Sequence, residues 1–360
     1  MNVTGSDVLV RSWQSSDNGA LLRIARTMSV PARVRLGIDR APDFASFSRA
    51  TGESFDIIIA DVRGQVAGFL ETRRLSFLLR GRPVPTIYFA LAGVEPGSRG
   101  LGMYPRLIAE AERRSRAAGA TLGLGFANVR NPRVTRFFAT NRDDIILGRK
   151  IVVSSILLGP RHQVRCGLTC GCATPADLPA ILELVNRCYS RHVLAPVVNE
   201  ACLKAVGTEN LAVARDGGGV VATLGIWDQR ALRRIMVAGY GRIEVWLRRL
   251  LNSATSLTHL ARLPAPGEEL RVLHATHAAA EPGREDAFAG LLRSVCNRYA
   301  DRGYHALLLG LPENDPLAAA TRGLWQFRNV DVPVLVPLPD IRPMLLESGV
   351  PSVRFEYAFA

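Results

Sequence analysis

The residues best suited to chemistry lie in a segment that reads Val-Glu-Pro-Gly-Ser-Arg-Gly-Leu-Gly-Met and spans residues 94–103. A strand is expected before this segment and a helix directly after it. Glycines at positions 100 and 102 let backbone N–H groups converge, and the positive end of the helix dipole adds to their field. Such an arrangement suits a pyrophosphate group. A glycine-rich turn that binds nothing is the alternative interpretation.

Two common nucleotide-binding motifs do not fit this segment, because it lacks both the Gly-Lys-Ser/Thr of a Walker loop and the third glycine of a dinucleotide fingerprint. It resembles the acyl-CoA loop of the GCN5-related N-acetyltransferase (GNAT) superfamily, Val-x-Pro-x-x-Arg-Gly-x-Gly-(Ile/Leu/Met)-Gly. The matching residues are Val94, Pro96, Arg99, Gly100, Gly102 and Met103, and Tyr104 replaces the last glycine. The resemblance implies that acetyl-CoA or another acyl-CoA is the donor. It further implies that Val94 contacts the pantetheine arm, and that the pyrophosphate is held by Arg99, Gly100, Leu101, Gly102, Met103 and Tyr104.

The same resemblance implies that Asn131 and Phe138 also contact the cofactor, and it suggests catalytic residues. Asn131 matches the Asn that starts the family's Asn-x-x-Ala-x-x-x-Tyr segment, but Phe138 stands at the Tyr position and cannot protonate the leaving thiolate. Either Tyr88 or Tyr104 replaces that acid, or the thiolate, with an intrinsic pKa of about 8.5, leaves unaided. Glu71 is the candidate general base, and a solvated Glu71 paired with Arg73 or Arg74 is the alternative.

The elements that would position these residues are read from hydrophobic patterns. Residues 55–62 and 65–79 predict a hairpin with a turn at Arg63-Gly64. Residues 86–94 and 121–127 predict two strands, with a helix at about 103–118 between them, and the resemblance implies that these strands splay apart to receive the pantetheine arm. A short helix at 131–139 and a strand at 151–158 that closes the sheet complete the first half.

The second half repeats this plan weakly after a Gly159-Pro160 linker. The expected fold is α/β with a mixed α+β sheet: two tandem GNAT-like domains, each a mostly antiparallel sheet flanked by helices. Residues 1–158 would form the catalytic, acyl-CoA-binding domain, and residues 159–342 a degenerate copy. Its loop at 280–286 is acidic where a CoA phosphate would bind, so the copy is expected to serve as a lid, substrate wall or dimerisation element.

Two further segments need separate interpretations. Residues 228–267 form an arginine-rich insertion that is expected to be helical. Packing of a basic amphipathic helix on its own protein is the favoured interpretation, and contact with a membrane, an acidic carrier protein or nucleic acid are the alternatives. Residues 343–360 are expected to form a C-terminal tail or strand.

Cysteine and histidine residues do not form a metal-binding pattern. His162, Cys166, Cys170 and Cys172 lack zinc-ribbon spacing, and the cysteines are expected to pack in the core from one strand face. His274 and His277 lie on an expected central strand. Structural roles are favoured for both, and His277 is the conceivable base. No metal is expected.

Composition limits the partners. Lys and Arg number 45 against 32 Asp and Glu, a net charge of +13, which suits an anionic partner. The chain shows neither a secretory signal pattern nor a long apolar run, and its six cysteines do not form a disulfide framework, so a cytoplasmic location is expected.

These observations predict an N-acyltransferase that moves an acyl group, acetyl being the first expectation, from acyl-CoA to a small-molecule amine by direct attack in a ternary complex. One alternative is a donor thioester on the phosphopantetheine of an acidic acyl carrier protein. Another is a non-catalytic CoA sensor or a nucleic-acid-binding protein. A homodimer is compatible with the sequence, and the acceptor amine is left open.

Overall fold

The computed structural model describes residues 8–28, 34–129, 131, 144–164, 167–255, 260–347 and 349–359. The strands are β1 (Val8–Ser12), β2 (Val34–Asp39), β3 (Ser54–Val62), β4 (Gln65–Leu79), β5 (Arg82–Val94), β6 (Leu122–Asn128), β7 (Ile146–Leu147), β8 (Ile151–Leu157), β9 (Thr169–Cys172), β10 (Leu194–Pro196), β11 (Leu211–Asp216), β12 (Gly219–Trp227), β13 (Arg234–Tyr240), β14 (Val272–Ala280), β15 (Ala306–Pro312) and β16 (Gln326–Pro337).

The α-helices are α1 (Asn18–Thr27), α2 (Ser46–Thr51), α3 (Met103–Ala117), α5 (Leu178–Tyr189), α6 (Glu200–Val206), α7 (Arg242–Ser253), α9 (Glu285–Tyr299) and α10 (Arg342–Leu346). Short 3-10 helices are η2 (Ser15–Asp17), η3 (Pro96–Ser98), η4 (Pro175–Asp177), η5 (Thr208–Asn210), η6 (Pro316–Thr321), η7 (Pro339–Ile341) and η8 (Tyr357–Phe359). Within the described residues, no helix combines the length and hydropathy needed to cross a membrane.

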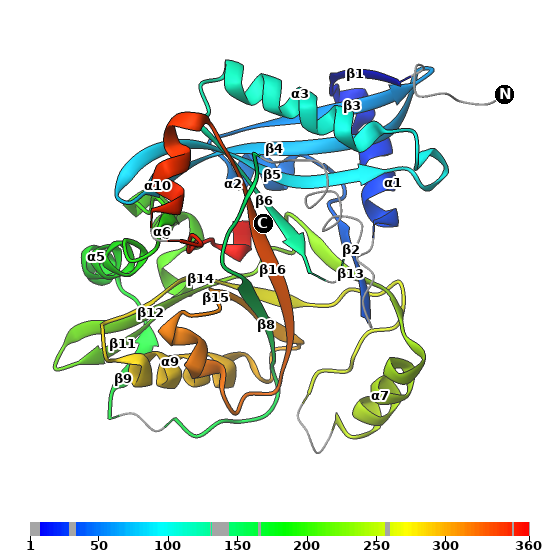
Figure 1. The fold of residues 1–360 in the computed structure, drawn as a ribbon. Coiled ribbons are helices and arrows are strands. Elements are labelled where there is room, and N and C mark those ends of the chain that lie inside the picture. Colours follow the sequence, from blue (N-terminus) through cyan, green and yellow to red (C-terminus); the bar gives the residue numbers. More distant parts are fainter. Residues whose placement is uncertain are drawn as a thin grey trace.

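One large mixed sheet runs through the molecule in the order β1-β3-β4-β5-β6-β16-β8-β15-β14-β12-β11-β9, with β10 paired to β4 and β7 to β16 (Figure 1). Its pairings are antiparallel except for β5 with β6 and β14 with β15. Helices cover both of its faces, which confirms the expected fold class. The first hairpin is also confirmed: β3 and β4 are joined at Arg63 and Gly64, whose φ angles of 53° and 81° fit a tight hairpin turn.

Strand β8 takes a different place from the one expected. It does not close a sheet made by the first half of the chain; it pairs with β15 on one side and β16 on the other. Strand β16, from late in the chain, in turn pairs with β6 along residues 122–128. The two halves therefore exchange strands, because hydrophobic patterns predict that a segment is a strand but not which neighbour it pairs with.

The two halves repeat the same layering around the sheet. In the first half, Leu107 of α3 packs on one face and Ile24 of α1 packs in a separate cluster with Phe69. In the second half, α9 and α5 contribute to two further clusters in the same way. A fifth cluster, which includes Phe77, Leu335 and Phe355, joins β4, β16 and the C-terminal segment. The expected domains, residues 1–158 and 159–342, therefore contribute strands to one shared sheet.

The insertion and the C-terminal segment both connect the halves. Part of the 228–267 insertion is β13, which pairs with β2 in a separate two-stranded sheet. Among the described residues of the insertion, the expected helix is therefore present as α7 alone. The C-terminal segment enters the middle of the molecule (Figure 1), where the Arg354 N–H donates to the Leu194 carbonyl at 2.8 Å. It is neither a free tail nor a regular strand.

Candidate active site

The central feature is the separation of β5 from β6. The two strands pair only from Thr86 to Tyr88, opposite Leu122 to Leu124. Beyond this point β5 stays with β4 as far as Val94, whereas β6 stays with β16. The expected splayed pair is therefore confirmed.

A register shift in β4–β5 pairing lies directly beside the split. Leu91 pairs with Glu71 and Phe89 pairs with Thr72, so Ala90 is the extra residue of a β-bulge. Residues 89–92 are only partly buried although they belong to a strand inside the sheet. Within the described residues, the bulge and the split thus leave part of the β5 backbone without a strand partner, where an extended ligand could bind.

The glycine-rich loop follows at the end of β5. Gly100 and Gly102 have φ angles of 93° and 68°, a backbone region that disfavours other residues, and a Cβ at either position would meet nothing within 4 Å. Gly102 is the N-cap of α3, and no side chain caps that helix. A helix N-terminus that follows such a glycine loop is a place where an anion can bind.

The remaining predicted loop residues differ in what they offer. Arg99 is exposed, whereas Met103 is buried against the sheet, so Met103 can present only its backbone to a ligand. Leu101 and Tyr104 pack against the same cluster. Burial raises the pKa of Tyr104 to about 12. Its ring belongs to the α3 side of the sheet.

Glu71 lies on β4 and is fully buried. It accepts hydrogen bonds from Arg40 Nη1 and Ser48 Oγ, each at 2.5 Å, and Arg73 Nε lies 3.3 Å from its Oε1 atom. Burial pushes the pKa of Glu71 up, but the two arginines and Ser48 together outweigh it, and the pKa is lowered. The solvated alternative is therefore wrong, although the Arg73 pairing that it included is present. Its contacts are those of a counter-ion, and the base role stays a prediction.

Tyr88 is the last residue of β5 that pairs with β6. Burial raises its pKa to about 12, and the Arg73 guanidinium lies 5.1 Å from its ring centroid. Its ring also packs on Phe126 and Phe355. Arg73 thus links Tyr88 to Glu71, whereas Tyr104 lies in a different cluster. The structure brings together two of the three predicted catalytic residues.

Asn131 follows β6, and its N–H donates to the Asn128 carbonyl at 2.9 Å. This turn places Asn131 just past the end of β6. Phe138 and most of the helix expected at 131–139 lie outside the described residues.

Two polar residues near the split were not predicted. Asp331 of β16 accepts hydrogen bonds from Asn128 Nδ2 and from the Tyr357 hydroxyl, both at 2.8 Å. Burial raises the pKa of Asp331 above its ordinary value. The Tyr357 ring packs on Phe126, the same ring that contacts Tyr88. No local sequence signal marks Asp331 or Tyr357, because they reach β6 only through the strand exchange and the return of the C-terminal segment.

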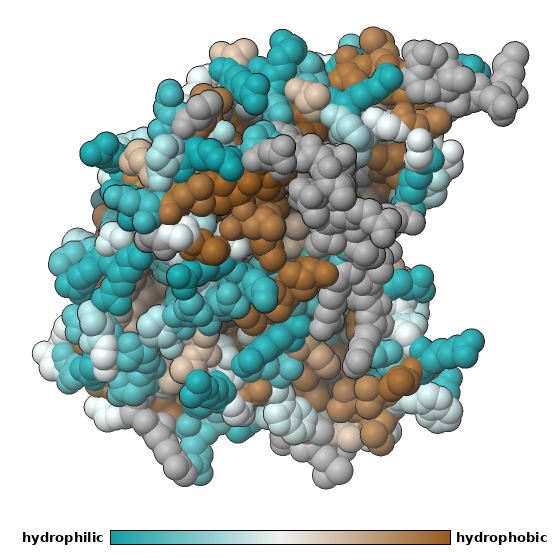
Figure 2. Space-filling view, in the orientation of Figure 1, coloured by the Kyte–Doolittle hydropathy of each residue, from teal (hydrophilic) through white to brown (hydrophobic). Residues whose placement is uncertain are grey.

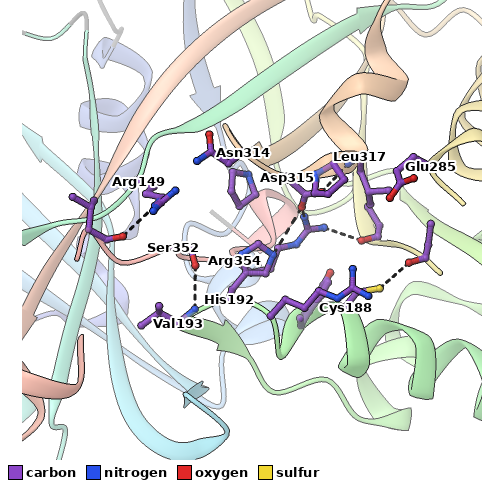
Figure 3. Close-up of a pocket in the computed structure, with 17 residues that line it drawn as sticks. Arg149, Cys188, His192, Val193, Glu285, Asn314, Asp315, Leu317, Ser352 and Arg354 are labelled. Atoms are coloured by element: carbon purple, nitrogen blue, oxygen red, sulfur yellow. Dashed lines mark hydrogen bonds and ion pairs between the residues drawn. The ribbon is translucent and has the colours of Figure 1, made fainter. Parts of the chain in front are cut away.

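The second half contains a cavity of about 360 Å³ (Figure 3). It lies where β14 and β15 diverge after His274, and the C-terminal end of α5 lines its other side. Arg354 crosses it, with Nη1 donating to Asp315 Oδ2 and Nη2 to the Ala278 carbonyl, both at 3.0 Å. Burial, with a smaller contribution from Arg354, lowers the pKa of His192 to about 4, so this imidazole is neutral at physiological pH. Among the polar lining residues is Glu285, from the start of α9 (Figure 3).

The remaining His and Cys residues do not assemble a metal site in the part of the chain that the structure describes. Burial lowers the pKa of the His277 imidazole to about 4. The backbone N–H of His277 donates to Glu356 Oε2 at 3.1 Å. Cys166 lies outside the described residues. Cys170 packs on the core, but Cys172 is exposed, so the expected core packing of this cysteine was wrong. Both belong to β9, a strand at the end of the sheet, where one side is open to solvent.

The fold is similar to that of solved acyltransferase structures. The chain matches Saccharomyces cerevisiae N-myristoyltransferase with bound myristoyl-CoA over 92% of its own length and 79% of that chain, with a TM-score of 0.61 and 12% identity. It matches a GCN5-related N-acetyltransferase from Sphaerobacter thermophilus over 91% and 95%, with a TM-score of 0.56 and 16% identity. A GCN5-related N-acetyltransferase from Anabaena variabilis matches over 91% and 72%, with a TM-score of 0.52 and 13% identity.

At these identities the likeness establishes the fold, which is the GNAT-type fold that the loop resemblance implied. No protein-family model and no curated protein matches the sequence.

Proposed function

We propose that this protein is an N-acyltransferase that uses acyl-CoA as donor and an amine as acceptor. The observation that carries the proposal is the split between β5 and β6 beside a bulge, with a glycine loop and an uncapped helix at its end. The pyrophosphate would bind the N–H groups of residues 99–104, and the pantetheine arm would lie along β5 up to Val94.

The reaction would proceed by direct attack of the amine on the thioester carbon. Backbone N–H groups of β5 near the bulge would stabilise the tetrahedral oxyanion, because the bulge frees them from strand pairing. Collapse of this intermediate breaks the C–S bond and releases CoA. Holding both reactants in one cleft would supply much of the rate enhancement.

Asp331 is our candidate for the general base. Its pKa is raised by burial, which brings it closer to the pH at which a base works best, and Tyr357 and Asn128 orient its oxygens. Tyr88 is the candidate acid, because a pKa of about 12 keeps its hydroxyl protonated at neutral pH. The donation to thiolate that Phe138 cannot make would then fall to Tyr88.

A thiol-release assay tests the proposal. Acetyl-CoA and a longer acyl-CoA are each incubated with a panel of small amines, and free CoA is measured over time. Release that depends on both the amine and the protein supports acyl transfer, and the preferred chain identifies the donor. If acyl-CoA binds but no amine accelerates release, the protein is a CoA sensor. If no acyl-CoA binds, a carrier-protein thioester is the next donor to test.

A further inference from the structure

Helix α7 carries its apolar side chains on the outside. Ile243, Trp246, Leu247 and Leu250 recur at helical spacing and are 70%, 70%, 49% and 65% exposed. None of the twelve residues of α7 is buried. A surface helix usually packs such a stripe against the protein. In α7 this orientation is reversed, and the apolar stripe faces solvent.

The reversal is fixed by polar contacts on the opposite face. Arg248 Nε donates to the Pro264 carbonyl at 2.9 Å, and Asn252 Nδ2 donates to the Leu263 carbonyl at 3.1 Å. Asn252 Oδ1 also accepts from the Leu263 N–H at 2.7 Å. These bonds join the polar face of α7 to residues 263–264, which lie between α7 and β14, so the apolar face points away from that segment.

The figures show the same arrangement. Helix α7 stands apart from the large sheet, at the lower right of Figure 1, and hydrophobic side chains gather there in Figure 2. A projecting helix offers a convex apolar surface, which enters a deformable layer more readily than a rigid groove.

Charge selects among the layers and partners that could cover this face. Arg242 and Arg249 are exposed on one flank of the stripe, and the Arg249 guanidinium lies 5.4 Å from the Trp246 ring centroid. The whole chain carries +13. An apolar stripe with an interfacial tryptophan and flanking arginines matches an anionic lipid surface.

A second copy of the chain fits less well. Antiparallel pairing of two α7 helices would bring Arg242 and Arg249 of one copy close to those of the other. A stable interface also takes about 800 Å² from each partner, more than four side chains of one helix supply.

We propose that α7 is an interfacial anchor that docks the protein reversibly on anionic membranes, with Ile243, Trp246, Leu247 and Leu250 entering the headgroup boundary. This surface is independent of the acyl-transfer site.

The test is co-sedimentation of the full chain with vesicles of phosphatidylcholine alone or mixed with phosphatidylserine. The proposal expects binding to the mixed vesicles, weaker binding at high salt, and a loss of at least about tenfold in the Trp246→Glu/Leu250→Glu variant. The matched control is Trp325→Glu/Phe327→Glu, which makes the same charge change at two other exposed hydrophobic residues and should bind like the wild type. Thermal unfolding confirms that each variant is folded.

Three results would overturn the proposal. The first is no binding to either vesicle, and the second is equal loss in both double variants, which would indicate general charge attraction. The third is a doubled mass in light scattering that only the Trp246→Glu/Leu250→Glu variant loses, which would assign α7 to a second copy.

Discussion

Asp331 and Asn128 lie 203 residues apart in the chain, yet Asn128 Nδ2 donates to Asp331 Oδ1 at 2.8 Å across paired strands. This contact exists because β16 crosses into the first half and pairs with β6. It places a partly buried carboxylate at the end of β6, beyond the point where β5 and β6 separate. The candidate active site is therefore completed by a strand from the other half of the chain.

If Asp331 is the general base, Asp331→Asn should lower kcat by about 10²–10⁴-fold while the protein stays folded. In the wild type, the rate should fall as pH drops through the raised pKa of Asp331, since only the ionised carboxylate accepts a proton. Tyr357→Phe removes a donor to the carboxylate and should move this limb of the pH profile to higher pH. An unchanged rate in Asp331→Asn would assign the base elsewhere.

The Glu71→Gln variant distinguishes between two roles of Glu71, as a counter-ion and as a catalytic base. If Glu71 is the counter-ion of Arg40 and Arg73, the Glu71→Gln variant should be less stable than the wild type by about 3–5 kcal/mol. Its lowered pKa means that this stability is present above its ordinary pKa and is lost as pH falls through the lowered value. Urea denaturation across acidic pH measures both effects, with the exposed Glu53→Gln as control. A fully stable but inactive Glu71→Gln variant would instead support the base role.

Glu356 should make stability depend on pH in the opposite sense. Its pKa is raised from 4.5 to about 8 by burial, so the folded protein keeps a proton that the unfolded chain has lost. Stability should therefore fall as pH rises through this window, by up to about 1.4 kcal/mol per pH unit, and level off above it. Glu356→Gln should abolish this slope, and Glu313→Gln, at an exposed site, should leave it in place. A flat wild-type profile contradicts the assignment.

The strand exchange predicts that the first half cannot fold alone. In a fragment of residues 1–158, the edge of β6 that pairs with β16 would be open from Leu122 to Asn128. Strand β8 would lose both of its partners, β15 and β16. We expect this fragment to be insoluble or to lack a cooperative unfolding transition, and co-expression with residues 159–360 to recover a folded complex. A stable, monomeric fragment would show that the two halves are independent domains.

Local patterns in the sequence predicted the parts of the fold that depend on local chemistry. The Arg63-Gly64 hairpin and the loop with Gly100 and Gly102 follow from turn residues and strand periodicity, whereas the splayed strands were expected from the resemblance of the loop to the GNAT superfamily. Strand partners could not be predicted this way, because the hydrophobic pattern of a strand such as β8 or β16 does not depend on which strand it pairs with. Asp331 and Tyr357 were missed for the same reason. The exposed face of α7 was missed because an amphipathic pattern does not say which face points inward.

The central claim is that the loop at residues 99–104 binds acyl-CoA, and calorimetric titration of acetyl-CoA tests it most directly. The matched variants are Gly102→Asp and Gly119→Asp, which both place a charged side chain at a positive-φ glycine, with φ of 68° and 76° and nothing within 4 Å of the added Cβ. Gly119 follows the C-terminal end of α3, away from the loop. The account predicts micromolar binding by the wild type and Gly119→Asp, and none by Gly102→Asp. Absence of binding by the wild type, or equal binding by both variants, would contradict it.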